Sequence, residues 1–175
     1  RVLFRSQGEV CCAGSRLLVQ ESIAGPLVEK LKRRLATIRV GDPLDKNTDV
    51  GAINNRAQLD KISKLVEAGV AEGAQIWQPP CELPARGFFF RPTLFTEVAL
   101  SHRIAREEIF GPVLSVLTFR TPDEAIEKAN NTEYGLSAGV WTEKGSRILA
   151  MASRLKAGVV WANTFNRLDR KSTRL

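Results

Sequence analysis

The feature that most constrains the fold is a β-rich apolar run, Val113 to Phe119, which leads directly into a helix start. Its β-branched and large apolar residues predict a central strand. Thr121 then offers a capping hydroxyl, Pro122 stands at the first helical position, and Glu124 completes a capping box. A buried strand followed at once by a capped helix is the building unit of α/β proteins.

The same alternation of strand and helix patterns continues on both sides of this unit. Strands are expected over residues 16–20, 75–77, 136–141 and 159–161. Helices are expected from a cap at Ser22 to a stop at Gly41, over residues 56–72, and over residues 146–157 with Gly158 as C-cap. The first helix carries an apolar stripe at every fourth position: Ile23, Leu27, Leu31 and Leu35. We therefore predict an α/β fold with a mainly parallel sheet and helices on both faces.

Composition narrows the class of protein. With 175 residues, of which 43% are hydrophobic, the chain can form one globular domain with a core. No apolar run approaches the roughly 20 residues that a membrane helix needs. The net charge of +7 raises the possibility of nucleic-acid binding, but most basic residues stand beside acidic ones. Only residues 167–174 concentrate positive charge, without aromatic residues between, so we expect a basic tail and no nucleic-acid partner.

The cysteine content argues against structural cross-links. The chain has three cysteines, no CxxC pair and a single histidine, which disfavours a disulfide framework and a metal site. A reducing compartment follows from this pattern: the cytoplasm is the first expectation and the mitochondrion the alternative.

Two of these cysteines stand together in the stretch from Gly8 to Ser15, among small residues and between two glycines. Small residues leave room for a reactant beside the sulfur, and glycines allow turns that point backbone amides at a developing negative charge. A thiolate in such a setting is a strong nucleophile. The alternative is that Cys11 and Cys12 are small buried hydrophobic residues ahead of a strand.

Residues 8–16 resemble the active-site cysteine motif of the aldehyde dehydrogenase superfamily, in which Gly, then Gln or Glu, then any residue, precede the nucleophile. By that match Cys11 is the nucleophile and Cys12 its neighbour. Residues 107–113, Glu-Glu-Ile-Phe-Gly-Pro-Val, resemble the cofactor-contacting segment of the same superfamily. Further matching segments follow in the family's order, at residues 87–95, 129–136 and 157–163. The resemblance covers residues 4–163, is nearest to the family 16 branch, and implies an incomplete fold of the aldehyde dehydrogenase catalytic-domain type.

The resemblance also implies a reaction and a cofactor. In the intact enzyme Cys11 attacks a small aldehyde to give a thiohemiacetal, whose oxyanion is held in part by the Cys11 backbone amide. Hydride passes to NAD or NADP and leaves a thioester, which water then hydrolyses to the carboxylic acid. The family also implies that the intact protein is a homo-oligomer.

Four residues are candidates for cofactor binding. By the match, Glu108 accepts hydrogen bonds from a ribose diol and Phe110 packs near the nicotinamide. The alternatives are a solvated acid and a core aromatic residue. Gln58 and Lys61 correspond to a Gln and a Lys that approach the nucleotide in the family, whereas ordinary surface polarity is the alternative for both.

The chain departs from the family in what it lacks. The family's general-base Glu, its oxyanion-hole Asn and its Rossmann-type cofactor domain have no counterpart here, and no G-x-G-x-x-G loop is present. After Asn163 the sequence leaves the family pattern. We therefore expect a partial catalytic domain over residues 1–163, an unmatched basic tail over residues 164–175, and no aldehyde oxidation by the chain alone.

Two other classes of function remain open. The first is a non-catalytic interaction or scaffold module that retains the aldehyde dehydrogenase fold. The second is a cysteine hydrolase that uses His102 as its base. The polar surroundings of His102 favour an ordinary loop histidine instead.

Overall fold

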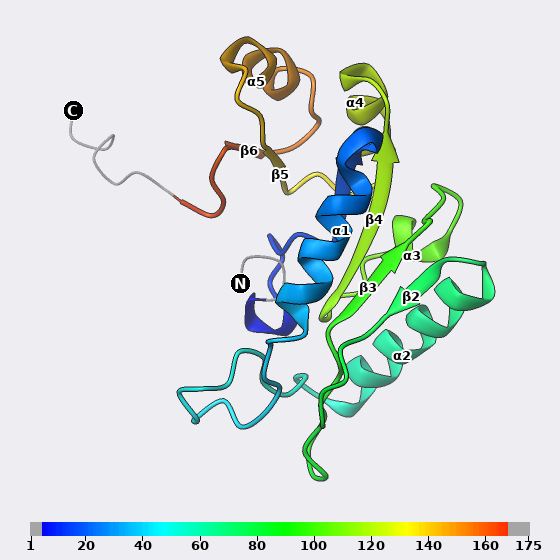
Figure 1. Ribbon diagram of the computed structural model, residues 1–175, viewed down its shortest axis with the longest axis vertical. Coiled ribbons are helices and arrows are strands. Elements are labelled where there is room, and N and C mark those ends of the chain that lie inside the picture. The colour runs from blue at the N-terminus through cyan, green and yellow to red at the C-terminus, as the bar shows by residue number, and fades with distance from the viewer. Residues whose placement is uncertain (1–4, 168–175) are drawn as a thin grey trace.

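A computed structural model describes residues 5–167, which form helices and strands interspersed along the chain (Figure 1). None of the helices within this range is both long and apolar enough to cross a membrane. In chain order the elements are η1 (Arg5–Gly8), β1 (Arg16–Gln20), α1 (Glu21–Leu35), α2 (Arg56–Ala71), β2 (Gln75–Trp77), β3 (Thr93–Thr96), α3 (Arg103–Arg106), β4 (Val113–Phe119), α4 (Pro122–Asn130), β5 (Ser137–Val140), α5 (Gly145–Ala152) and β6 (Val159–Ala162).

Four strands form the main sheet in the order β1-β4-β3-β2. Strand β4 pairs in parallel with β1 on one side, where Arg16 lies opposite Ser115, and with β3 on the other. Only the edge strand β2 runs antiparallel, against β3. The predicted α/β fold with a mainly parallel sheet is therefore confirmed, as is the predicted strand from Val113 to Phe119.

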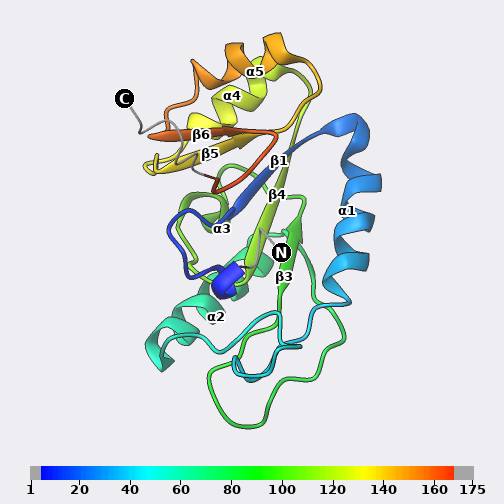
Figure 2. The same ribbon diagram turned by 90° about the vertical axis from the view of Figure 1, so that its left-hand side faces the viewer.

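Both faces of the main sheet are covered, which explains why β4 is apolar along most of its length. Side chains alternate between the two faces, so that Val113 and Phe95 join one cluster while Leu114 and Leu94 join the other. Helix α2 packs on the first face and α1 on the second, as Figure 2 shows on either side of the sheet. The helix residues in these clusters are Leu59, Ile62, Leu65 and Val66 from α2, Ile104 from α3, and Ala24, Leu27, Val28, Leu31 and Leu35 from α1.

The remaining parallel pair forms a separate two-stranded sheet. Strands β5 and β6 pair with Ser137 opposite Val159, and α5 connects them. Together, β5, α5 and β6 lie at the upper end of the molecule in Figure 1. The sequence predicted these elements, but not their separation from the main sheet.

Helix α4 starts as its sequence predicts. The Thr121 hydroxyl accepts a hydrogen bond from the Glu124 N–H (3.2 Å), and Pro122 is the first helical residue. The Glu124 carboxylate reaches back to the N–H of Arg120 (2.7 Å), one residue earlier than a capping box requires. At the other end, the Arg16 guanidinium donates to the Ala129 carbonyl (3.0 Å), and burial lowers the pKa of Arg16.

Three predicted helix ends are wrong, and the first is the stop at Gly41: helix α1 already ends at Leu35, with Ala36 as its C-cap. Helix α1 begins at Glu21 rather than after Ser22, because β1 runs into it without a loop and Gln20 takes the N-cap position with no side-chain hydrogen bond. Helix α5 ends at Ala152 with Ser153 as its C-cap, and Gly158 instead donates its N–H to the Gly135 carbonyl (2.8 Å) at the entry to β6.

Candidate active site

The cysteine pair lies in a tight turn between η1 and β1. The N–H of Ala13 donates to the Val10 carbonyl (2.8 Å), which places Cys11 and Cys12 at the two middle positions of the turn. Cys11 is exposed, whereas Cys12 is half-buried, and both are free thiols. The alternative that both are buried core residues therefore does not hold for Cys11. A reactant can reach this thiol from solvent.

A carboxylate anchors the cysteine turn to a distant part of the chain. Both oxygens of Glu9 accept the backbone N–H of Asn54 (3.1 and 3.2 Å), next to Asn55, whose side chain caps helix α2. This role of Glu9 was not predicted. No local pattern signals it, because the two residues are 45 positions apart.

The segment from Glu108 to Phe110 follows the short helix α3. Its middle residue, Ile109, is buried in the α2-facing cluster. Glu108 and Phe110 are both half-buried, and the Glu108 N–H donates to the Tyr134 hydroxyl (3.3 Å). Within residues 5–167 no hydrogen bond or ion pair engages the Glu108 carboxylate. Its oxygens are therefore open to hydroxyl donors.

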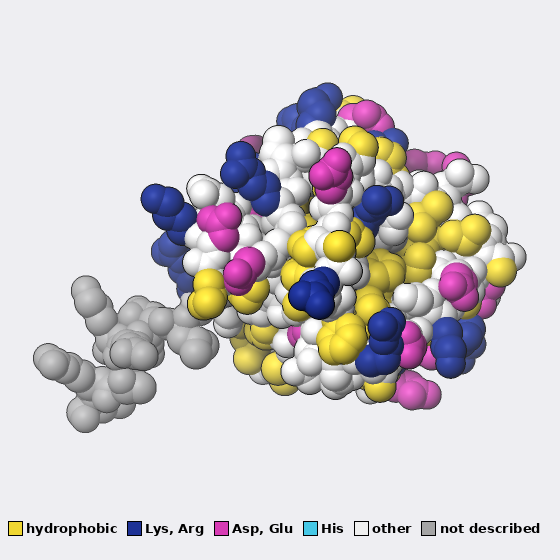
Figure 3. All heavy atoms as spheres, turned by 90° about the horizontal axis from the view of Figure 1, so that it is seen from below, with side chains coloured by type: hydrophobic (Ala, Val, Ile, Leu, Met, Phe, Trp, Pro, Cys, Tyr) yellow, Lys and Arg dark blue, Asp and Glu magenta, His cyan; other side chains and the backbone are white. Residues whose placement is uncertain are grey.

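The two motifs meet because they lead into neighbouring parallel strands, β1 and β4. A side chain on Gly8 would overlap the carbonyl oxygen of Gly111, so the cysteine loop lies against the end of the Glu108–Phe110 segment. Gly8 also has φ +75°, a conformation that favours glycine. This contact lies at the amino ends of the strands, and Figure 3 views that end of the molecule, where apolar side chains gather between charged ones.

Gln58, on helix α2, lies beside the Glu108–Phe110 segment. Its Nε2 donates to the Ile109 carbonyl (3.0 Å) and to the Phe110 carbonyl (2.9 Å). The family resemblance implied that Gln58 approaches the nucleotide, but it did not indicate that the side-chain amide bonds to the backbone of this segment.

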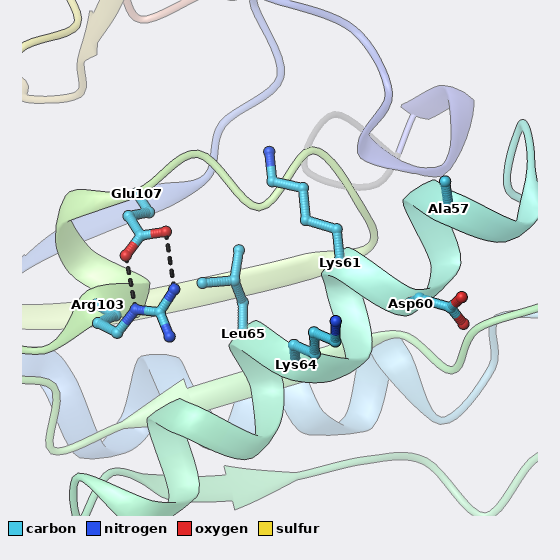
Figure 4. A pocket seen from close by; sticks show the side chains of 7 residues that line it. All are labelled: Ala57, Asp60, Lys61, Lys64, Leu65, Arg103 and Glu107. Atoms are coloured by element: carbon cyan, nitrogen blue, oxygen red, sulfur yellow. Dashed lines mark hydrogen bonds and ion pairs between the residues drawn. The ribbon is translucent and has the colours of Figure 1, made fainter.

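Lys61 is exposed and lies one turn further along α2. It lines a cavity of about 420 Å³ between α2 and α3, drawn in Figure 4. On the far side of this cavity Arg103 and Glu107 form an ion pair (2.6 Å). The cavity is lined by Ala57, Asp60, Lys61, Lys64, Leu65, Arg103 and Glu107.

The charges around this cavity shift the ionisation of Glu107. The hydrogen bond from Arg103 lowers the pKa of the Glu107 carboxyl, and the positive charge of Lys61 lowers it further. The same hydrogen bond raises the pKa of Arg103. Lys61 thus lies within electrostatic reach of the residue next to Glu108.

The single histidine makes a hydrogen bond to a residue near it in sequence. His102 precedes α3 as its N-cap residue, and its Nδ1 accepts the N–H of Ala99 (3.3 Å). In the described part of the chain no three His, Cys, Asp or Glu side chains come together in a way that could hold a metal ion.

These residues fit one wall of a nicotinamide nucleotide site. The half-buried Glu108 carries acceptor oxygens of the kind that ribose hydroxyls would engage, and the half-buried Phe110 carries an aromatic ring against which a nicotinamide would pack. Both lie on the segment that contacts the cysteine loop through Gly111.

Comparison with known proteins agrees with this geometry. The profile of the aldehyde dehydrogenase family matches residues 1–174. The chain is 45% identical over 167 residues to a betaine aldehyde dehydrogenase of Brucella anthropi. The aligned region covers 93% of this chain and 34% of that protein. It is 43% identical to human retinal dehydrogenase 2, over 97% of this chain and 33% of the relative.

A solved structure gives the same result for the fold. The NAD-dependent aldehyde dehydrogenase of Sinorhizobium meliloti superimposes with a TM-score of 0.91 and 41% identity, over 95% of this chain and 33% of that one. The chain thus spans about a third of the length of the proteins it matches. The match to the family profile extends past residue 163. The division into a catalytic domain over residues 1–163 and a tail over residues 164–175 stays a prediction, because residues 168–175 lie outside the described part of the chain. On the sequence match and the fold together, this chain belongs to the aldehyde dehydrogenase family.

Proposed function

We propose that this chain is the part of an NAD(P)-dependent aldehyde dehydrogenase that supplies the nucleophile and one wall of the nicotinamide site. The contact between Gly8 and Gly111 is the observation that carries the proposal. It joins the loop of an exposed thiol to a segment with an open carboxylate and an aromatic ring. An aldehyde oxidation by covalent catalysis requires such a pairing, because the thiol and the hydride acceptor must approach the same carbon atom.

Cys11 is the nucleophile in this proposal. Its thiolate attacks the aldehyde carbon and forms a thiohemiacetal, and the carbonyl oxygen becomes an oxyanion. Within residues 5–167 the N–H of Cys11 has no hydrogen-bond partner, so it can donate to that oxyanion. After oxidation the substrate remains as a thioester on Cys11, and water releases it as a carboxylic acid.

Glu108 and Phe110 hold and orient the nicotinamide end of NAD or NADP, which when bound supplies the hydride acceptor. The Glu108 carboxylate accepts ribose hydroxyls and the Phe110 ring packs beside the nucleotide. Lys61 contributes positive charge near the cofactor, and Gln58 belongs to the same wall. Several solved relatives support this assignment of cofactor, among them a betaine aldehyde dehydrogenase of Staphylococcus aureus in complex with NAD⁺.

The rest of the machinery belongs to the intact protein. The family resemblance assigns the general-base Glu, the oxyanion-hole Asn and the Rossmann-type domain to sequence outside this chain. The 175-residue chain alone should therefore give no NADH signal above a Cys11→Ala control when mixed with NAD and short aldehydes. A homo-oligomeric state and a cytoplasmic location of the intact enzyme stay predictions.

The decisive test compares the two adjacent cysteines in the full-length enzyme. Cys11→Ala should lower kcat for aldehyde oxidation by about a thousandfold or more, because it removes the group that forms the covalent intermediate. Cys12→Ala is the matched control and should retain most of the activity. If Cys12→Ala loses activity and Cys11→Ala keeps it, Cys12 is the nucleophile. If both variants keep their activity, the proposal of a cysteine-dependent dehydrogenase is wrong.

A further inference from the structure

Both side-chain N–H donors of Gln58 are engaged by the protein backbone. A side-chain amide carries two N–H donors, and those of Gln58 meet two successive backbone carbonyls, of Ile109 and Phe110. The backbone N–H of Gln58 is also engaged, by the side chain of Asn55 at the start of α2 (2.8 Å). Gln58 is thus held at the helix end and joined directly to the segment that carries Glu108 and Phe110.

This segment needs such support because its backbone is in an unfavourable conformation. Phe110 has φ +55°, in the left-handed region that bulky residues rarely adopt. The next residue, Gly111, packs so closely on Ile62 that a side chain there would overlap it. Helix α2 therefore holds the segment at two neighbouring points: by the amide of Gln58 and by the packing of Ile62.

We propose that Gln58 is a positioning residue, which fixes the backbone of residues 109–111 and thereby sets where Glu108 and Phe110 meet the cofactor. This inference rests on the proposed function only for what the segment binds. It differs from a direct contact between Gln58 and the nucleotide, to which the side chain would offer only its Oε1 acceptor, because both amide donors are engaged with the protein backbone.

The chain offers a matched control for the test. Gln78 also donates one side-chain hydrogen bond between elements, from its Nε2 to the Thr93 hydroxyl (2.8 Å). Gln58→Met and Gln78→Met each keep the length of the side chain and remove its donors. Both residues are half-buried. Gln58→Met removes two side-chain hydrogen bonds and Gln78→Met removes one, to the Thr93 hydroxyl rather than to residues 109–111.

The first measurement is amide hydrogen exchange of the cofactor-free chain. Gln58→Met should speed exchange in peptides covering residues 107–114 by about tenfold, since the segment loses the hydrogen bonds that hold its unfavourable backbone. Gln78→Met should leave those peptides unchanged. If Gln58→Met does not give a folded chain by circular dichroism, Gln58→Glu replaces it, because a carboxylate cannot donate to the two carbonyls.

The second measurement is steady-state kinetics of the full-length enzyme. Gln58→Met should raise the apparent KM for NAD by about tenfold and leave the KM for aldehyde unchanged. Unchanged exchange with a raised KM for NAD would identify a direct nucleotide contact and overturn the positioning role, as would unchanged values of both quantities. Faster exchange with an unchanged KM for NAD would instead show that Gln58 holds the segment, and it would overturn the cofactor role proposed for Glu108 and Phe110.

Discussion

The four-stranded sheet and the β5–α5–β6 unit are built from the same alternation, yet they differ in how much of their apolar surface is covered. In the main sheet α1 and α2 cover opposite faces, and Leu94 and Leu114 are fully buried. In the smaller unit no residue of α5 is buried within the described part of the chain. Trp141 and Leu149 expose 64% and 75% of their surface.

The difference shows which part of the fold has its apolar surface covered by this chain alone. A parallel strand pair is stable when apolar layers cover both of its faces, and only the main sheet meets that condition here. The cysteine loop and the Glu108–Phe110 segment both enter the main sheet, so the candidate site is attached to the well-covered part. The β5–α5–β6 unit presents apolar surface that a solvated domain rarely leaves open.

The largest expected effect comes from opening the core of the main sheet. Phe95→Ala removes a ring that is fully buried in the α2-facing cluster, and it should lower the free energy of unfolding by about 3–5 kcal/mol. Leu149→Ala, in the smaller unit, should change it by less than about 0.5 kcal/mol because that side chain is already in water. Urea unfolding followed by circular dichroism measures both. Equal losses would contradict the contrast between the two units.

The next effect tests the contact that joins the two halves of the site. Gly8→Ala places a methyl group against the Gly111 carbonyl and should cost about 2–3 kcal/mol, with slower or altered labelling of Cys11 by iodoacetamide. Gly73→Ala is the matched control: Gly73 also has a positive φ, +96°, but a methyl group there meets no atom within 4 Å. If the two variants lose the same stability, backbone strain alone accounts for the loss and the close approach has no separate effect.

Local patterns predicted much of the main sheet. The strand Val113–Phe119 and the cap at Thr121 follow from β-branched content and capping chemistry, which operate within a few residues. Helix α2 was expected over residues 56–72 and spans Arg56–Ala71, because its apolar residues recur at helical spacing. The order of the strands was not predicted, since it depends on contacts between distant segments.

The errors have identifiable causes. Strand β3 was not predicted, because its four residues follow Pro92 and gain their hydrogen bonds only from β2 and β4. Ser22 was expected to cap α1 on composition, but the pairing of Gln20 with Phe119 extends β1 to the residue before the helix. Propensity could not show this, because strand pairing determines where β1 ends.

The candidate site divides in the same way. The family resemblance pointed to Cys11, Glu108 and Phe110 through short motifs. It also implied that Gln58 and Lys61 approach the nucleotide. The sequence could not show that Gly8 touches Gly111 or that Gln58 bonds to the Ile109 and Phe110 carbonyls. Those contacts depend on β1 and β4 being neighbours and on the packing of α2 against one face of the main sheet.

A smaller effect should appear when the open surface of the smaller unit is made polar. Leu149→Ser should leave the free energy of unfolding within about 0.5 kcal/mol of the original chain, because Leu149 is 75% exposed. It should reduce self-association at high concentration, since an exposed apolar patch favours contact between copies. Light scattering across a concentration series measures this. Unchanged association would show that this surface does not drive contact between copies.

The smallest effect concerns the ion pair beside the site, and its pH dependence has a definite sign. The pKa of Glu107 lies below its ordinary value of 4.5 because Arg103 donates a hydrogen bond to the charged form. Its stabilisation is therefore present above pH 4.5 and lost as the pH falls through the lowered pKa. Glu107→Gln should cost only about 0.2–0.5 kcal/mol at pH 7, because both side chains are about half exposed and the pair is screened by water.

The matched control is Glu143→Gln, an exposed acid between β5 and α5 in the smaller unit. Its replacement should change stability little at any pH. Urea unfolding of each variant at pH 7 and at pH 3 gives the comparison: the difference between Glu107→Gln and the original chain should shrink at the lower pH, as the carboxyl of the original chain begins to bind its proton. A difference that grows toward pH 3 would mean that the folded chain favours the protonated form of Glu107, and the ion pair with Arg103 would then not stabilise the folded chain.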